Sequence, residues 1–170
     1  CEELAYPWLS EPQLASQIDR RAKQFGVTVL GTGINPGFFM DTFPLVLTGI
    51  CREVKKIEAI RAITTGLRRD SYQKKIGTGL YPEEFKEKIK KGEITGHVGF
   101  RESVALTAAA LGLKLDKIVE LPPEPVVADK EVKTTYTTVK KNQMLGYIDV
   151  VKGTKDEKDV IVYKLIMHAG

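Results

Sequence analysis

Three strand-like runs follow one another near the end of the chain, and they constrain the fold more than any other feature. They cover residues 133–139, 144–152 and 160–167, and Asn142 and residues 153–158 carry turn signals between them. Before them, helical and strand-like patterns are interleaved. Interleaved helices and strands followed by a run of strands predict an α+β (mixed α/β) fold with a mixed, largely antiparallel sheet.

The earlier elements are predicted from periodicity and from end signals. Ser10 opens a capping box with Gln13, and Gly26 ends the helix that follows. Residues 27–30 form a short β-branched run that is typical of a buried strand. The remaining predictions are a helix over 41–51, a strand over 56–64, a basic loop over 65–80, helices over 82–91 and 102–111, and a Pro-rich connector at 121–125 that cannot join a central strand.

Composition limits the classes of protein to which the chain can belong. Its 170 residues, 42% hydrophobic and 28% charged, suit one ordinary domain, or one with a small appendage, and exclude wholesale disorder. No stretch approaches the 18 or so consecutive apolar residues that a transmembrane helix needs. Two cysteines make a disulfide framework implausible, so we expect a reducing cytoplasm, and with His97 and His168 they match no zinc-ligand spacing. The chain starts at Cys1 rather than Met, and we expect a piece of a longer protein.

The positive charge is concentrated in one segment. The net charge is +4, and residues 52–75 hold eight Lys or Arg against three acidic residues. The rest of the chain is therefore close to neutral. One local concentration fits a small anion better than a nucleic-acid backbone, so we expect neither nucleic acid nor a membrane as partner.

A glycine-rich loop at 31–37 follows a predicted strand and precedes a helix, as a dinucleotide-binding fingerprint would. Arg68 and Arg69 would then hold a 2′-phosphate. Against this hypothesis, the last glycine interval is one residue too long, Pro36 and Pro44 delay the helix, and no acidic residue ends the next strand. We favour a loop that lines a site or turns the chain between domains, and keep the nucleotide site as the alternative.

The basic loop is the second candidate site. Four cations lie within eight residues there, and a Gly-Thr-Gly tripeptide follows: Arg68, Arg69, Lys74, Lys75, then Gly77, Thr78 and Gly79. Glycines let backbone N–H groups approach an anion closely, so the loop could bind a carboxylate, with a lysine nearby as proton donor or acceptor. A solvated basic loop is the equally open alternative. Outside it, His97 is more typical of a cap or a surface residue, and Asp41 of an N-cap.

Four phrases of the sequence carry a resemblance to a known family. They are CEELAYPW from residue 1, VLGTGINPGFFMDTFPLVLTG from residue 29, QKKIGTGL with PEEF behind it, and HVGFRES from residue 97. With them, the chain resembles the C-terminal two thirds of the dihydrodipicolinate-reductase-like oxidoreductases, in particular the branch of 2,4-diaminopentanoate dehydrogenase.

The resemblance implies a domain layout and an activity. Residues 1–30 would end a Rossmann-type domain whose NAD(P) fingerprint lies upstream. Residues 31–170 would form a domain, with helices on one face of its sheet, that binds substrate, carries catalytic residues and makes a homo-oligomer through the C-terminal sheet. The parent would use NAD(P) to act on a carbon–nitrogen centre of a small anionic, amino-acid-like substrate, while this segment alone would not bind the cofactor. The alternative is a non-catalytic anion-binding or assembly domain that lacks its own cofactor site.

The resemblance also implies roles for the basic loop. Lys74 or Lys75 takes the place of the family's lysine, which makes these two the catalytic candidates. Gly77, Thr78 and Gly79 resemble the backbone cradle that binds the substrate carboxylate.

Other positions follow from the same resemblance. Arg68 and Arg69 occupy the stretch in which the reductase has paired histidines, which favours an amino or imino substrate other than dihydrodipicolinate. Asn35 lies in the loop that corresponds to the one beside the nicotinamide, and is a possible contact with it. Gln73 and His97 are the remaining residues that we expect to bind substrate, although His97 has no assigned equivalent in the family.

Overall fold

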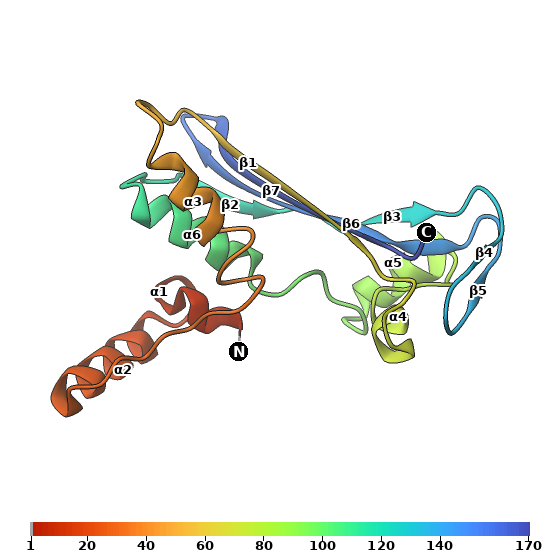
Figure 1. Cartoon of the computed structure of the whole chain (residues 1–170), viewed down its shortest axis with the longest axis horizontal. Coiled ribbons are helices and arrows are strands. Elements are labelled where there is room, and N and C mark those ends of the chain that lie inside the picture. Colours follow the sequence, from red (N-terminus) through yellow and green to blue (C-terminus); the bar gives the residue numbers. More distant parts are fainter. Residues whose placement is uncertain (1) are drawn as a thin grey trace. The chain divides into compact units, whose positions relative to one another are not determined.

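The computed structural model describes residues 2–170, and its elements confirm the α+β class (Figure 1). Fourteen elements follow in chain order: η1 (Glu2–Ala5), α1 (Pro7–Ser10), α2 (Pro12–Phe25), α3 (Thr42–Thr48), β1 (Ile57–Thr64), α4 (Asp70–Lys75), α5 (Pro82–Lys90), α6 (Phe100–Ala110), β2 (Lys117–Glu120), β3 (Glu124–Val127), β4 (Val132–Lys133), β5 (Thr138–Val139), β6 (Met144–Lys155) and β7 (Lys158–His168).

The main sheet is built around the long hairpin of β6 and β7. Its order is β1-β7-β6-β2, and β3 also pairs with β6, next to β2 along that strand. Asp156 and Glu157 join the hairpin with φ values of 49° and 60°, the positive angles that a two-residue type I′ turn requires. Both β2 and β3 run antiparallel to β6. The amide of Thr65 donates to the carbonyl of His168 at 2.9 Å, so the ends of β1 and β7 meet and these strands run parallel. The sheet is therefore mixed, as predicted.

The chain divides into two compact units, which we describe separately. Unit 1 holds residues 1–59, 98–120 and 151–163, and unit 2 holds 60–97, 121–150 and 164–170. Each unit takes part of β6 and part of β7. None of the helices described within residues 2–170 is long and apolar enough to cross a membrane.

The core of unit 1 lies along α6. Seven apolar side chains of α6, β6 and β7 are buried there: Phe100, Val104, Ala105, Ala108, Val151, Ile161 and Tyr163. Gly153 has no room for a side chain, because a Cβ atom would come within 2.9 Å of Val104 Cγ1. The buried hydroxyls of Thr107 and Tyr163 share a hydrogen bond of 2.7 Å, which satisfies both polar groups inside this core.

The core of unit 2 centres on the ring of Phe85 in α5. This ring stacks on Tyr147 of β6, with centroids 5.7 Å apart and planes at 30°. Gly77 adopts φ 78° beside it, and a Cβ atom there would come within 2.9 Å of the Phe85 ring. A smaller apolar cluster joins Ala128, Val139, Leu145 and Ala169.

Two N-terminal predictions were wrong. Ser10 does not cap α2, which begins after Glu11 without a side-chain cap; its hydroxyl donates instead to the buried Glu102 of α6. Residues 27–30 form no strand, and Val27 and Val29 are 58% and 50% exposed. Gly26 does end α2, in a left-handed conformation at φ 62°.

Two later predictions, for the basic loop and for residues 133–139, differ from the structure. The basic loop contains the helix α4, and the single strand expected over 133–139 is the ribbon β4–β5, closed by a turn in which Thr134 Oγ1 accepts from the Thr137 amide. The strands β2 and β3 were not predicted from the sequence. Pro125 lies in β3, on the same side of β6 as β2, so no proline enters the middle of the sheet.

Candidate functional site

Gln73 shapes the basic loop from within. Its side chain is 1% exposed, and Nε2 donates to the carbonyls of Gly66 and Arg68 at 3.0 and 2.9 Å. Its Oε1 accepts from the hydroxyl of Thr134 at 2.8 Å. With its polar groups bonded inside the fold, Gln73 positions Arg68 rather than facing open space for a substrate.

The two candidate lysines lie in the last turn of α4. Lys74 forms an ion pair with Asp70 one turn earlier, at 2.6 Å, and its side chain is 75% exposed. Lys75 is also exposed. Because no low-dielectric surroundings enclose them, both suit electrostatic attraction of an anion better than desolvated proton transfer. Their assignment as catalytic residues stays a prediction.

The backbone amides of the Gly77-Thr78-Gly79 turn donate hydrogen bonds within unit 2. The amide of Gly77 donates to Lys74, that of Thr78 to Gln73 and that of Gly79 to Met144, each to a carbonyl at 2.8–3.0 Å. The Thr78 hydroxyl donates to the Leu145 carbonyl at 3.3 Å. A carboxylate at this turn would therefore be held in this structure by the neighbouring cations, and not by these three amides.

Three arginines belong to the basic loop or to the strand before it, and one of them, Arg61, was not predicted as a site residue. Arg68 and Arg69 are exposed just before α4, while Arg61 is half-buried on β1. Burial lowers the pKa of Arg61, the nearby Tyr72 opposes this shift, and the charge of Arg68 adds to it. The alternation along β1 was the available signal, since Arg61 shares its less exposed face with Ile57.

A buried carboxylate on β6 is the second residue that sequence analysis missed. Asp149 is fully buried, and its Oδ2 accepts from the backbone amide of His97 at 2.5 Å. Burial raises the pKa of Asp149, against the lowering effect of hydrogen bonds from the amides of His97 and Val150. The available signal was an aspartate inside the apolar run GYIDVV.

In unit 1, two of the phrases that carry the family resemblance pack together. The amide of Gly37 and the hydroxyl of Ser103 both donate to Asp41 Oδ2 at 2.7 Å, and Asp41 Oδ1 accepts from the Thr42 amide. Gly99 packs so closely that a Cβ atom would come within 2.5 Å of the Pro36 ring. The GINPGFFMD segment is thus fixed on the start of α6, and Asp41 is the N-cap of α3, as predicted.

Asn35 lines a cavity in the same unit. The cavity has a volume of about 390 Å³ and is bordered by η1 and the loop, through Glu2, Ala5, Thr32, Gly33, Ile34, Asn35 and Pro36. This volume lies within the range of small-molecule sites. The Asn35 side chain therefore has a hollow beside it, and its contact with a nicotinamide stays a prediction.

The alternative hypothesis of a dinucleotide site over residues 27–69 is wrong for this structure. Such a site needs a strand before the loop and a free helix N-terminus for the pyrophosphate. Residues 27–30 are not a strand, and the N-terminus of α3 already carries the carboxylate of Asp41. A second anion would be repelled there.

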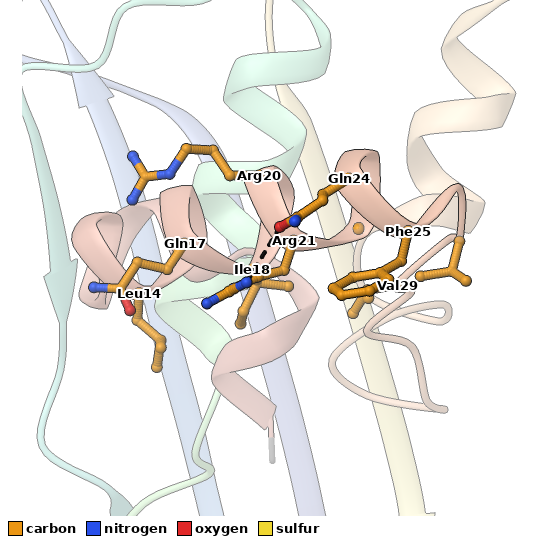
Figure 2. A pocket seen from close by; sticks show the side chains of 10 residues that line it. Leu14, Gln17, Ile18, Arg20, Arg21, Gln24, Phe25 and Val29 are labelled. Carbon is orange, nitrogen blue, oxygen red and sulfur yellow. Dashed lines mark hydrogen bonds between the residues drawn. The ribbon is translucent and has the colours of Figure 1, made fainter.

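A large groove follows α2 and the segment after it (Figure 2). Its volume is about 700 Å³, and Leu14, Ile18, Phe25, Val27 and Val29 are among the residues that line it. Phe25 is 68% exposed.

Within residues 2–170, no group of three or more His, Cys, Asp or Glu side chains is placed to hold a metal ion.

Comparisons with known proteins relate this chain to dehydrogenases. The family model of the 2,4-diaminopentanoate dehydrogenase C-terminal domain matches residues 38–168. The curated 2,4-diaminopentanoate dehydrogenase of Acetoanaerobium sticklandii is 41% identical over 145 residues, which are 85% of this chain and 41% of that protein. The solved amine dehydrogenase from Mycobacterium smegmatis shares the fold, with a TM-score of 0.77 at 20% identity over 99% of this chain and 50% of that one. The chain thus spans half or less of these relatives, and it belongs to the family of 2,4-diaminopentanoate dehydrogenase C-terminal domains.

Proposed function

We propose that the chain is the substrate-binding, catalytic and oligomerisation part of a longer NAD(P)-dependent oxidoreductase that acts on a carbon–nitrogen centre. The observation that carries this proposal is the 41% identity to a 2,4-diaminopentanoate dehydrogenase over 85% of the chain. The substrate class is then an amino acid with a further amino group. A cytoplasmic location fits such a metabolic role.

A bound nicotinamide cofactor would supply the hydride acceptor or donor. The N-terminus of α3, which follows the glycine-rich loop, offers no pyrophosphate site, because the carboxylate of Asp41 occupies it. The loop around Asn35 offers a hollow of suitable size for the nicotinamide end. We assign the rest of the cofactor site to a preceding domain, whose end would be residues 1–30 and which would cover the exposed side chains of Phe25 and Val27.

The substrate carboxylate would be held by the cations of unit 2. Arg68 follows the turn that Gln73 fixes, and Arg69 and Lys75 are exposed beside it. Guanidinium groups bind carboxylates with two parallel hydrogen bonds, so Arg68 and Arg69 suit this role. Lys74 and Lys75 add attraction for the anion, or move a proton at the reacting nitrogen.

The test is turnover of 2,4-diaminopentanoate by the full-length enzyme with Lys74→Ala and with Lys75→Ala. Loss of the lysine that acts should lower kcat/KM tenfold or more. Lys86→Ala, an exposed lysine on α5, is the matched control. If both variants keep the wild-type kcat/KM, the lysine assignment is wrong. If the wild type does not turn over the compound with NAD⁺ or NADP⁺, the proposed function is wrong.

The oligomer proposal rests on the exposed face of β1. Glu58, Ile60, Ala62 and Thr64 share this face, and Ile60 is 59% exposed. An apolar side chain on an edge strand is a surface that a second copy would cover. Light scattering should show an oligomer for the wild type and for Glu58→Gln, and a monomer for Ile60→Lys. A wild-type monomer would contradict the proposal.

The engaged amides of the Gly-Thr-Gly turn and the exposure of Lys74 and Lys75 favour one alternative, a basic surface that binds anions without catalysis. In that case, the chain would bind a simple carboxylate such as acetate as well as it binds 2,4-diaminopentanoate. Isothermal titration with the two compounds distinguishes these functions.

A further inference from the structure

Arg68 carries an exposed side chain on a fixed backbone. Its amide donates to the Thr65 carbonyl at 2.9 Å, and its carbonyl accepts from Gln73 Nε2 at 2.9 Å. Because both backbone groups of Arg68 are hydrogen-bonded within unit 2, its guanidinium group projects from a fixed main chain. A cation fixed in this way loses less conformational entropy on binding an anion than a cation on a mobile loop does.

The orientation of the Gln73 side-chain amide is set by two carbonyl groups. Nε2 lies within 3.0 Å of the carbonyl oxygens of Gly66 and Arg68, and a carbonyl oxygen can only accept. Nε2 must therefore point at the basic loop, and Oε1 points at Thr134, whose hydroxyl donates to it at 2.8 Å. Since the Gln73 side chain is 1% exposed, water has little access to replace this hydroxyl.

The hydroxyl of Thr134 joins this amide to the ribbon of β4 and β5. Thr134 lies in the turn that closes the ribbon, where its Oγ1 also accepts from the Thr137 amide at 3.0 Å. The ribbon meets the basic loop a second time, because the Thr135 amide donates to the Gly66 carbonyl at 3.0 Å. The Gly66 carbonyl thus accepts from the ribbon and from Gln73. One hydrogen-bond network therefore holds the turn of the ribbon and the start of the basic loop together.

We propose that Thr134 is a positioning residue for the substrate carboxylate. Its hydroxyl fixes the Gln73 amide, and the Gln73 amide fixes the backbone from which Arg68 reaches the carboxylate. Without the hydroxyl, Oε1 is buried and unsatisfied, so the amide must turn or shift, and its bond to the Arg68 carbonyl is weakened. This inference rests on the proposed function and deepens it, because it gives the ribbon, which lies outside the basic loop, a part in substrate binding.

The experiment measures steady-state kinetics of the full-length enzyme with 2,4-diaminopentanoate. Thr134→Val replaces the hydroxyl with a methyl group of similar size, and should raise the KM for this substrate by about fivefold or more. Because Thr134 acts on binding and not on the hydride step, kcat and the KM for the nicotinamide cofactor should change less than about twofold. Thr134→Ser keeps the hydroxyl and should restore the KM. Thr135→Val, an exposed neighbour in the same turn, is the matched control.

A double-mutant cycle with Arg68→Ala separates positioning from a general loss of stability. Arg68→Ala should itself raise the KM, and Thr134→Val should add no further increase in that background, since the positioned group is gone. Additive increases, an unchanged KM in Thr134→Val or in Arg68→Ala, or a failure of Thr134→Ser to restore the KM would overturn the inference. Wild-type turnover of 2,4-diaminopentanoate is the separate test of the proposed function.

A second measurement needs no variant, so it does not depend on whether Thr134→Val folds. Amide hydrogen exchange of the wild-type enzyme is followed with and without saturating 2,4-diaminopentanoate. Because the bound carboxylate requires the positioned Arg68, binding should slow exchange of the Thr135 and Thr137 amides, whose hydrogen bonds belong to the network. The Lys91 amide, at the end of α5, is the control and should be unaffected. Unchanged exchange in the ribbon would contradict the positioning role of Thr134.

Discussion

The two units each bury an aspartate, and the two carboxylates differ in how many of their oxygens accept hydrogen bonds. Asp41 in unit 1 and Asp149 in unit 2 are both fully buried. Asp41 accepts from the Gly37 amide, the Thr42 amide and the Ser103 hydroxyl, so both of its oxygens are used. Asp149 uses Oδ2 and leaves Oδ1 without a partner in the described chain.

The difference separates a carboxylate whose two oxygens both accept hydrogen bonds from one that leaves an oxygen unpartnered. A buried carboxylate with both oxygens hydrogen-bonded ties segments together, and its removal leaves donors unpaired. A buried carboxylate with an unpartnered oxygen lowers the stability of the folded chain while the carboxylate is ionised. Equal burial therefore does not mean equal function, and the hydrogen bonds decide between the two.

The largest expected effect is that of Asp41→Asn. The asparagine side chain has one acceptor oxygen in place of two, and its NH₂ group would face groups that donate to Asp41 in the wild type. The free energy of unfolding should therefore fall by about 3 kcal/mol. Urea unfolding of the chain at pH 7 measures it, with Asp129→Asn as an exposed control. A loss below about 1 kcal/mol would mean that Asp41 does not hold unit 1 together.

Gly96→Ala should come next, with a loss of about 1–2 kcal/mol from the contact between the new Cβ atom and Asp149 Oδ2. Thr95→Ala is the neighbouring exposed control. In an Asp149→Ala background the loss should disappear, which a double-mutant cycle detects. A loss that persists there would place its cause elsewhere, in the contact with Pro123.

Ser103→Ala should lower the stability by about 1 kcal/mol, because Asp41 keeps its two amide donors when this hydroxyl is removed. Ser16→Ala, whose exposed hydroxyl donates to the Pro12 carbonyl within α2, is the matched control. If Ser103→Ala costs as much as Asp41→Asn, the charge-assisted amide bonds are not what stabilises the loop.

Asp149→Asn should give the smallest change, and with the opposite sign. Because burial raises the pKa of Asp149, the folded chain binds this proton more tightly than the unfolded chain, and its stability falls as the pH rises through the carboxyl's ordinary range. The variant lacks this penalty, so it should gain on the wild type between pH 4 and pH 7. Urea unfolding at the two pH values tests this. If the variant instead becomes less stable than the wild type toward pH 7, ionised Asp149 stabilises the folded chain.

The sequence predicts the fold class, the family and several element ends, because these depend on local pattern. Asp41 is an N-cap and Gly26 a C-cap for reasons contained within a few residues. Residues 27–30 were predicted as a strand and do not form one. A strand forms only when a second strand hydrogen-bonds to it, and the pattern of apolar residues does not show whether the chain supplies that second strand.

The site was harder to predict, because its contacts join distant positions. The basic loop was found from its charges, but the sequence does not show that the Gly77-Thr78-Gly79 amides bond within the fold. Asp149 was hidden in an apolar strand, and its partner His97 lies 52 residues away. Burial and partner choice are tertiary properties, which composition and spacing do not contain.

The buried amide of Gln73 has a consequence for how the sequence can change. It joins the loop at Gly66 and Arg68 to Thr134, which lies 61 residues further along the chain. An apolar replacement of Gln73 removes the donor that its side chain supplies to the carbonyls of Gly66 and Arg68. An apolar replacement of Thr134 removes the hydroxyl that donates to the buried Oε1 of Gln73. The two positions should therefore vary together among descendants of this sequence, and libraries that randomise the ribbon should randomise Gln73 with it.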